Sequence, residues 1–169
     1  FCGDFDTVVF DGPLGRDERE LALRLALRGY SVVSSADGRT CSGILLGFLA
    51  DFPPHEQPAV RSRLAAGLSA VIALQLLPKA SGKGRCLASE VLPVTPAVRE
   101  LVLKNQLAGI DKLLRSADSG KGPGADAGFQ SMNSVLCRLA VKKALSLEAA
   151  RAASPDPEGL QTLIEGTSL

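Results

Sequence analysis

The chain has 169 residues, of which 46% are hydrophobic and 22% charged, a composition typical of a single globular domain. Nineteen basic against eighteen acidic residues give a net charge of +1, so the total charge provides no single-signed field for nucleic acid or an anionic bilayer. Aromatic residues make up only 4% and tryptophan is absent, which also argues against a base-stacking platform. We therefore expect no nucleic-acid partner.

The cysteines and the single histidine do not suggest a metal centre. Cys2, Cys41, Cys86 and Cys137 are far apart in the chain and form no C-x-x-C pair. This spacing favours buried thiols, although an extracellular chain would use an even number of cysteines for disulfides. Because His55 is the one histidine, a zinc site would need thiolates from the whole chain, and we predict no metal.

The sequence contains no pattern typical of a signal peptide or of a membrane span. The first residues, FCGD, lack the basic region of a signal peptide, and the longest apolar run, 44–50, is far shorter than the ~20 residues that span a bilayer. We expect no membrane insertion. Since the chain starts without methionine and enters a strand almost at once, we also expect an upstream portion of the protein.

The first 35 residues predict a β-α-β unit. Residues 7–10 (TVVF) are a β-branched and aromatic run that predicts a core strand, ended by a loop at 11–13 (DGP). Leucines and alanines among charges predict a helix over 16–28, and Gly29 is its C-cap. A second strand is expected over 30–35. This order of elements is typical of parallel sheets.

Two helices and a hairpin are expected next. Residues 42–50 and 56–68 predict helices, separated by Phe52-Pro53-Pro54. Residues 68–77 and 84–94 are β-rich, and the turn-like hexapeptide 78–83 between them predicts an antiparallel hairpin.

The last third of the chain is predicted to be mainly helical. Thr95-Pro96 places a capping hydroxyl before a proline at the first helical position, which predicts a helix to about Leu103. Helices are also expected over 107–116, 130–145 and 146–153, while 155–169 either forms a short helix or frays. Glycines make 118–128 a flexible loop. The expected organisation is a core portion at 1–117, this loop, and C-terminal helices at 129–169.

Five segments, in the same order, resemble the C-terminal half of the PilT-type ATPases of type IV pili and type II and IV secretion. They are Asp6 with TVVF, LSAVIALQLLP at 68–78, the GRxxAxE-like strand at 84–90, TPAVRELV at 95–102 and GFQSM at 128–132. The resemblance implies an α/β, RecA-like fold of the P-loop NTPase family, with a mostly parallel sheet, an antiparallel hairpin and a C-terminal helical bundle.

The same resemblance implies ligands and partners. ATP and Mg²⁺ are expected on family grounds only. Expected partners are other PilT-type subunits, in homo- or hetero-oligomers, and platform proteins of the pilus at the inner membrane. The expected location is cytoplasmic, peripheral at that membrane through partners.

The phosphate-binding loop of such ATPases is absent from the sequence. Segments 80–84 (ASGKG) and 119–122 (SGKG) look similar, but glycine follows each lysine and the pattern G-x-x-x-x-G-K-[ST] fails. We interpret them as a turn and a linker and predict no cofactor-binding residue in this chain. In the family the true loop lies upstream of Asp6.

The hydrolytic positions hold different residue types. The resemblance places Asp11-Gly12 at the family's Gly-Glu, so the glutamate that positions water is replaced by Gly12. Asp11 is shorter and points to the opposite face, and we favour a turn-stabilising role over catalysis for it. A register shift that aligns Arg16-Asp17 with the family's Met-Arg-Asp still leaves no glutamate between Asp11 and Asp17.

The histidine box of the family is also altered. Asp37 occupies its position, where a carboxylate would repel a γ-phosphate. Arg39, two residues on, would either contact a phosphate or lie in solvent.

A candidate interaction motif lies in the helix after Thr95. Ala97, Val98 and Leu101 are predicted to form an apolar stripe, with Arg99 and Glu100 turned outward. The resemblance implies a surface motif needed for retraction. Packing of an ordinary amphipathic helix on its own core is equally compatible with the pattern.

These patterns favour a catalytically degenerate PilT-like subunit, not itself an enzyme, that docks to a motor ring or to pilus-base proteins. Two alternatives stay open. One is the C-terminal half of an active, ATP-hydrolysing retraction motor whose P-loop lies upstream. The other is an adaptor that binds a regulator through the region of the 118–128 loop.

Overall fold

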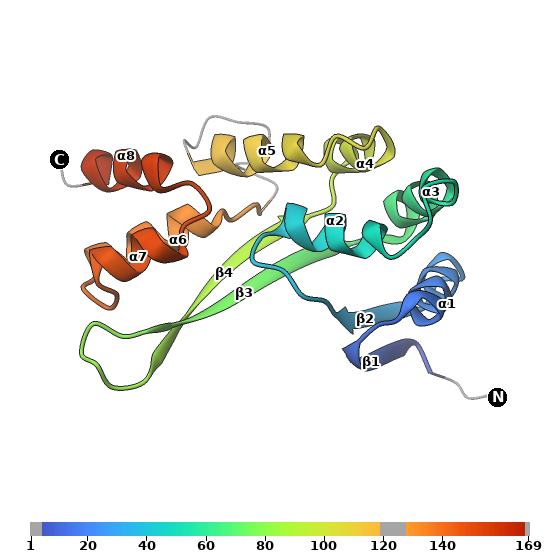
Figure 1. Ribbon diagram of the computed structural model, residues 1–169, viewed down its shortest axis with the longest axis horizontal. Coiled ribbons are helices and arrows are strands. Elements are labelled where there is room, and N and C mark those ends of the chain that lie inside the picture. Colours follow the sequence, from blue (N-terminus) through green and yellow to red (C-terminus); the bar gives the residue numbers. More distant parts are fainter. Residues whose placement is uncertain (1–4, 119–127, 168–169) are drawn as a thin grey trace.

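The computed structural model describes residues 5–118 and 128–167. Its elements, in chain order, are β1 (Thr7–Pro13), α1 (Arg16–Leu27), β2 (Ser31–Ser35), α2 (Cys41–Ala50), α3 (Gln57–Gly67), β3 (Ala70–Pro78), β4 (Arg85–Pro93), α4 (Pro96–Leu103), α5 (Ala108–Asp118), α6 (Met132–Val141), α7 (Leu147–Ala153) and α8 (Pro157–Thr167). Strands β1 and β2 form a parallel sheet, and β3 and β4 form a separate antiparallel one. The hairpin crosses the middle of the molecule, with α1 at one end and α6 to α8 at the other (Figure 1).

The first three elements form the predicted β-α-β unit. β1 and β2 pair in parallel from Thr7 with Ser31 to Phe10 with Ser34. Helix α1 begins after Gly15, and Gly29 follows its end with a φ of +95°. Glycine adopts a positive φ with little strain, so the predicted glycine C-cap is confirmed.

β1 continues beyond its apolar run. The register shifts between Phe10 and Pro13, which pairs with Ser35, so Asp11 and Gly12 form a bulge within the strand. Gly12 has a φ of +103°. The predicted loop at 11–13 is therefore wrong in this detail, because a glycine in the left-handed region lets the strand absorb extra residues and keep pairing.

The predicted hairpin is confirmed. β3 and β4 pair in an unbroken antiparallel register from Ala70 with Pro93 to Pro78 with Arg85. Since side chains alternate between the faces of a strand, the hairpin has a buried and an outer face. The buried face carries Val71, Ala73, Ala88, Glu90 and Leu92. The outer face carries Ile72, Leu74, Leu76 and Leu87, which are 54%, 58%, 62% and 52% exposed.

Helices α2 to α5 pack over the buried face of the hairpin (Figure 1). Threonine hydroxyls cap two of them: Thr40 Oγ1 accepts from the Gly43 N–H at 3.1 Å, and Thr95 Oγ1 accepts from the Val98 N–H at 3.4 Å. The largest apolar cluster lies between these helices and the strands. It includes Leu45, Phe52, Val60, Leu64, Leu92, Val98, Val102, Ile110 and Leu114.

The C-terminal helices form a second cluster on the same hairpin. α6 ends earlier than the predicted helix over 130–145, because Lys143 adopts a φ of +56° and the Ala144 N–H bonds to the Leu139 carbonyl. Of the two outcomes expected for 155–169, a short helix or a frayed end, the structure shows the helix, α8. Buried members of this cluster include Ala88, Met132, Leu136, Leu145, Ala150 and Leu160.

Several sequence expectations touch residues outside the described ranges. Most of the predicted flexible loop at 118–128 lies there, as does Cys2. Cys41, Cys86 and Cys137 are free thiols. Within 5–118 and 128–167 we find no helix with the length and apolar character needed to cross a bilayer, and no group of side chains arranged to bind a metal ion. The division at 117 and 128 stays a prediction.

Candidate functional site

The bulge of β1 carries Asp11 and Gly12, the residues predicted to correspond to the family's hydrolytic pair. The Asp11 side chain is exposed. A Cβ built on Gly12 would meet no atom within 4 Å, so space does not exclude a side chain there. The backbone conformation disfavours a side chain at this position, because Gly12 has a φ of +103° and residues other than glycine are strained in that region. The position that the resemblance assigns to the family's glutamate therefore presents only backbone.

The loop from β2 into α2 carries Asp37, the residue predicted to occupy the histidine-box position. Gly38 packs so closely on α2 that a Cβ would lie 2.4 Å from Ile44 Cγ1 and 3.1 Å from the Ile44 backbone nitrogen. Gln75 Nε2 donates to the Arg39 carbonyl at 3.3 Å. The side chains of Asp37 and Arg39 are both exposed. The backbone of this loop is thus held in place, and its charged side chains reach solvent.

The fold brings Asp11, Gly12 and Asp37 to one edge of the parallel sheet. β1 and β2 are neighbours and run in the same direction, so their carboxyl ends lie side by side. Open α/β sheets bind ligands at this edge. Here it carries two exposed carboxylates, which disfavour the approach of a polyphosphate.

The glycine-lysine segment at 80–84 is the tip of the hairpin, so its interpretation as a turn is confirmed. A phosphate cradle needs free backbone N–H groups that lead into a helix. Here the Gly82 N–H donates to the Lys79 carbonyl and the Ala80 N–H to the Ala144 carbonyl, both at 2.9 Å, and a strand follows. The segment at 119–122 lies outside the described residues. The part of the chain that the structure covers therefore does not fit the phosphates of ATP, and no hydrolytic step is derived from it.

The candidate interaction motif on α4 is partly internal. Val98 is fully buried and Leu101 packs against the core, whereas Ala97 is exposed and does not belong to the buried stripe. Arg99 is not turned outward as predicted: it donates to the carbonyls of Ala65 and Ala66 at the end of α3. A cation suits a helix C-terminus, where carbonyls lack partners, and this explains its inward position.

Glu90 is a site residue that the sequence interpretation missed. Its side chain is 4% exposed on the buried face of β4. One carboxylate oxygen accepts from the Cys41 N–H at 2.7 Å, and the other accepts from the Met132 N–H at 3.3 Å. These are the first residues of α2 and α6, so one carboxylate binds two helix N-termini. The sequence signal that could have revealed this role is an acidic residue at a position of β4 that the strand's alternation turns inward.

The Cys41 thiol lies next to Glu90 and is held by hydrogen bonds. Its Sγ donates to the carbonyls of Val71 and Glu90, at 3.4 and 3.7 Å. Burial, and secondarily the charge of Glu90, raise the pKa of Cys41 well above its ordinary value. The thiol is a structural group and not a nucleophile.

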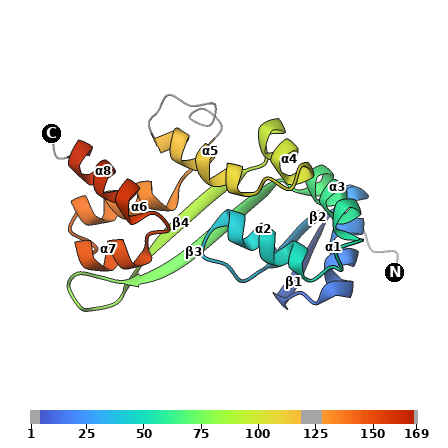
Figure 2. The same cartoon turned by 45° about the horizontal axis from the view of Figure 1, so that its top comes forward.

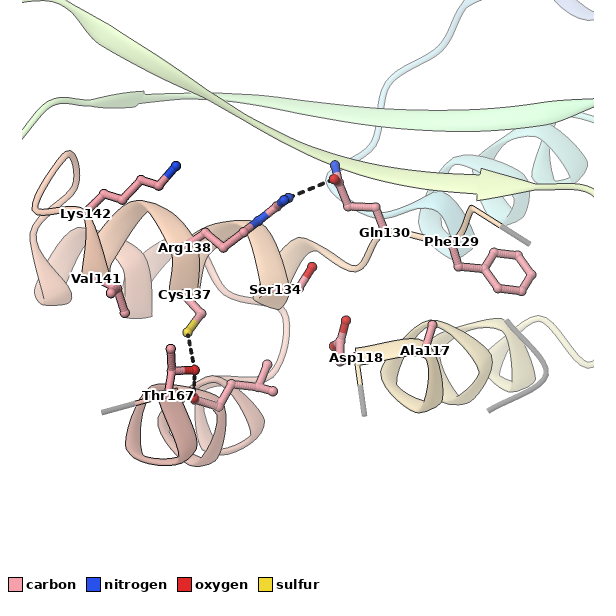
Figure 3. Close-up of a pocket in the computed structure, with 11 residues that line it drawn as sticks. Ala117, Asp118, Phe129, Gln130, Ser134, Cys137, Arg138, Val141, Lys142 and Thr167 are labelled. Carbon is pink, nitrogen blue, oxygen red and sulfur yellow. Dashed lines mark hydrogen bonds between the residues drawn. The ribbon is translucent and has the colours of Figure 1, made fainter. Parts of the chain in front are cut away.

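Two cavities lie away from the edge that carries Asp11 and Asp37. One, of about 450 Å³, opens between the end of α5, α6 and α8; Arg138 and Lys142 extend from it toward the strands, opposite Cys137 and Thr167 (Figure 3). Arg138 already donates to Gln130 Oε1 at 2.8 Å. The other, of about 400 Å³, lies beside Glu90 between α5 and the start of α6. Burial raises the pKa of Asp118 in the first, against opposing bonds from the hydroxyls of Ser131 and Ser134.

Comparison with known proteins places these features in a family. No family model matches the chain. It is 31% identical over 140 residues to a twitching motility protein of Neisseria gonorrhoeae, and 30% identical over 138 residues to the type IV pilus retraction ATPase PilT of Pseudomonas aeruginosa. Those alignments cover 83% and 82% of this chain. The structure of the pilus retraction motor PilT with bound ADP matches it with a TM-score of 0.78 and 30% identity, over 93% of the chain. The chain belongs to the PilT-type ATPase family.

The match is to part of a longer architecture. The chain spans 36% and 38% of the two relatives and 42% of the PilT structure, less than half of each. The matched part is the C-terminal portion of the PilT-type fold, and the predicted RecA-like α/β class is confirmed.

Proposed function

We propose that this chain is a catalytically degenerate PilT-like subunit, located in the cytoplasm, that acts by docking to a ring of PilT-type subunits or to proteins of the pilus base. Gly12 is the observation that carries the proposal. It stands where the family has the glutamate that positions water, and its φ of +103° disfavours any side chain there. Loss of a general base typically lowers a rate by about 10²- to 10⁴-fold.

The histidine-box position supports the same conclusion. Asp37 is exposed at the edge where the γ-phosphate would lie, and like charges at short range repel. Gly38 and the Gln75 bond nonetheless preserve the shape of that loop. Retained backbone with altered chemistry is the pattern expected of a subunit kept for assembly.

One observation supports the upstream half that the alternative, an active retraction motor, requires. The outer face of the hairpin exposes Ile72, Leu74, Leu76 and Leu87 side by side. Within the described residues, β2 pairs only with β1 and β3 only with β4. Apolar sheet faces and open strand edges are normally covered by further structure. A nucleotide-binding half packed there would supply it, and the exposed face therefore supports a longer protein without specifying its activity.

ATP turnover by the full-length natural protein separates the two hypotheses. A degenerate subunit hydrolyses ATP only at background, alone and when mixed with a PilT-type partner, and Asp11→Asn leaves that background unchanged. An active motor hydrolyses ATP at rates comparable to its relatives. If Asp11→Asn then abolishes turnover, Asp11 is the substitute base and the degenerate hypothesis fails.

Docking is tested on the exposed side of α4, where Ala97, Glu100 and Leu103 face solvent. Ala97→Asp should weaken binding to a PilT-type ring at least about tenfold, equivalent to ~1.4 kcal/mol. Ala152→Asp on α7 is the matched control, because that alanine is also exposed but on a distant helix. Equal binding by the Ala97→Asp variant and the wild type would exclude this face of α4 as the docking surface.

A further inference from the structure

The tip of the hairpin and the turn between α6 and α7 meet, although they are far apart in the sequence. The Ala80 N–H donates to the Ala144 carbonyl at 2.9 Å. This contact brings the two turns, whose residues include several lysines, to one end of the molecule (Figures 1 and 2). The cluster, here named the basic tip, consists of Lys79, Lys83, Arg85, Lys142 and Lys143.

The cations of the basic tip are not neutralised by described neighbours. All five side chains are exposed, and within 5–118 and 128–167 none has a hydrogen-bond or ion-pair partner. Segments 76–89 and 138–147 contain no acidic residue. The buried Glu90 follows the first segment and Glu148 follows the second. Several other cations have an acidic partner, as in Arg16–Glu56, Arg19–Asp51, Arg63–Glu20, Lys104–Glu100 and Arg115–Asp156.

The net charge of the whole chain does not reveal the positive charge concentrated at the basic tip. Apart from the basic tip, fourteen basic residues are outnumbered by eighteen acidic ones, so the net charge of +1 arises from this cluster. A sequence total cannot report such segregation. A patch of this kind attracts an anionic surface over about one Debye length.

We propose that the basic tip is a docking surface for an anionic lipid bilayer. Four of its five cations are lysines, which act as mobile point charges and lack the planar fork that arginine uses for specific carboxylate or phosphate recognition. The turn of the hairpin lies at the edge of the molecule, where a large partner can approach it (Figure 1). No aromatic residue lies in 76–89 or 138–147, which disfavours stacking on nucleobases.

Apolar side chains flank the cations in the way that a lipid interface requires. Leu76 and Leu87 are cross-strand partners just behind the turn, and Leu147 begins α7 at 53% exposure. At a bilayer, cations meet the headgroups while leucines enter the boundary with the acyl chains. The contact of the cations with headgroups does not depend on nucleotide turnover, so it stands whether or not the proposed degenerate function holds. The contact of Leu76 and Leu87 with lipid additionally requires that no further structure covers this end of the outer face.

Sedimentation of the full chain with vesicles tests the proposal. Vesicles of phosphatidylcholine mixed with phosphatidylglycerol should bind the chain, vesicles of phosphatidylcholine alone should not, and ~0.5 M salt should release it. Each lysine near such a surface contributes about fivefold in affinity, so Lys79→Glu with Lys83→Glu should weaken binding at least about twentyfold. Both positions lie in an exposed turn, which leaves the fold intact; circular dichroism confirms it.

The matched control is Arg24→Glu with Arg28→Glu, which changes the net charge equally at the opposite end of the molecule (Figure 1). This control should bind nearly as the wild type does. If both double variants lose the same amount of vesicle binding, the binding depends on net charge. If the wild type binds neutral vesicles as tightly as anionic ones, the binding depends on the apolar outer face. Tighter binding to duplex DNA or to polyglutamate than to the anionic vesicles would assign the basic tip to a nucleic acid or an acidic protein. Each of these four results overturns the proposal.

Discussion

The Glu90 carboxylate accepts a hydrogen bond from the backbone N–H of Cys41 at 2.7 Å, inside the protein. Its other oxygen accepts from the N–H of Met132 at 3.3 Å. Strand β4 thus holds the start of α2, directly after the loop with Asp37, and the start of α6, where the C-terminal helices begin. One side chain links the two apolar clusters of the chain.

Replacing Glu90 should therefore be costly. Glu90→Ala leaves two buried N–H donors without acceptors and should lower the free energy of unfolding by about 2–4 kcal/mol. Glu90→Gln keeps one acceptor oxygen and should lower it by ~1–2 kcal/mol. Urea midpoints at constant slope give both values. Glu100→Gln, on the exposed side of α4, is the control and should shift the midpoint much less. A Glu90→Ala variant as stable as the wild type would contradict the bridging role.

The three described cysteines should differ in reactivity. Burial and the Glu90 charge raise the pKa of Cys41, and alkylation requires the thiolate. At pH ~8.5, iodoacetamide should modify the half-exposed Cys86 first and Cys41 only when the protein unfolds globally. Peptide mass spectrometry over time measures the order. Modification of Cys41 at the rate of Cys86 would show that the α2 terminus opens locally.

Two glycines of the same region should respond oppositely to alanine. At Gly38 the added Cβ would lie 2.4 Å from Ile44 Cγ1 and close to the Ile44 backbone, so Gly38→Ala should destabilise the protein by about 1–3 kcal/mol. A Cβ added at Gly47, inside α2, would meet no atom within 4 Å. Gly47→Ala should therefore stabilise the protein by about 0.5–1 kcal/mol. Thermal unfolding compares them. If Gly38→Ala and Gly47→Ala shift the melting temperature in the same direction, the close contact of Gly38 with Ile44 is disproved.

Asp118 should make stability depend on pH. Burial raises its pKa above the ordinary 3.8, so the folded state holds the proton more tightly than the unfolded state. Stability from this group is present at low pH and is lost as pH rises through the folded pKa. Asp118→Asn should accordingly be more stable than the wild type at neutral pH. The difference should shrink as pH falls through that window toward 3.8, as measured by urea midpoints at each pH. A difference that grows on acidification would reverse the assigned sign.

The local elements were predictable because their signals are local. Thr95-Pro96 begins α4, Gly29 ends α1, and the alternating segments on either side of 79–84 pair as a hairpin. Caps, turns and periodicity depend on neighbours within a few residues, which sequence patterns capture. The bulge at Asp11-Gly12 was missed because a bulge depends on the partner strand as well as its own residues.

The candidate site was predictable only in part. Sequence order places Asp11 and Asp37 after successive strands, and parallel pairing brings them to one edge. The roles of Arg99 and Glu90 were not visible, because each binds the end of a helix that lies far away in the chain. Hydrogen bonds of this kind require a known packing of helices on the hairpin.

The amino-acid sequence alone determined the family of this chain and its α/β class, since motif order and residue identity do not depend on packing. Tertiary structure decided which charges are neutralised and which gather. Lys83 and Lys142 lie at one end because the hairpin packs on the C-terminal helices, with the Ala80 N–H bonded to the Ala144 carbonyl. Glu90 links two clusters because two helices begin beside it. Contacts between distant segments arise when apolar faces are buried together, and a linear pattern does not specify which faces meet.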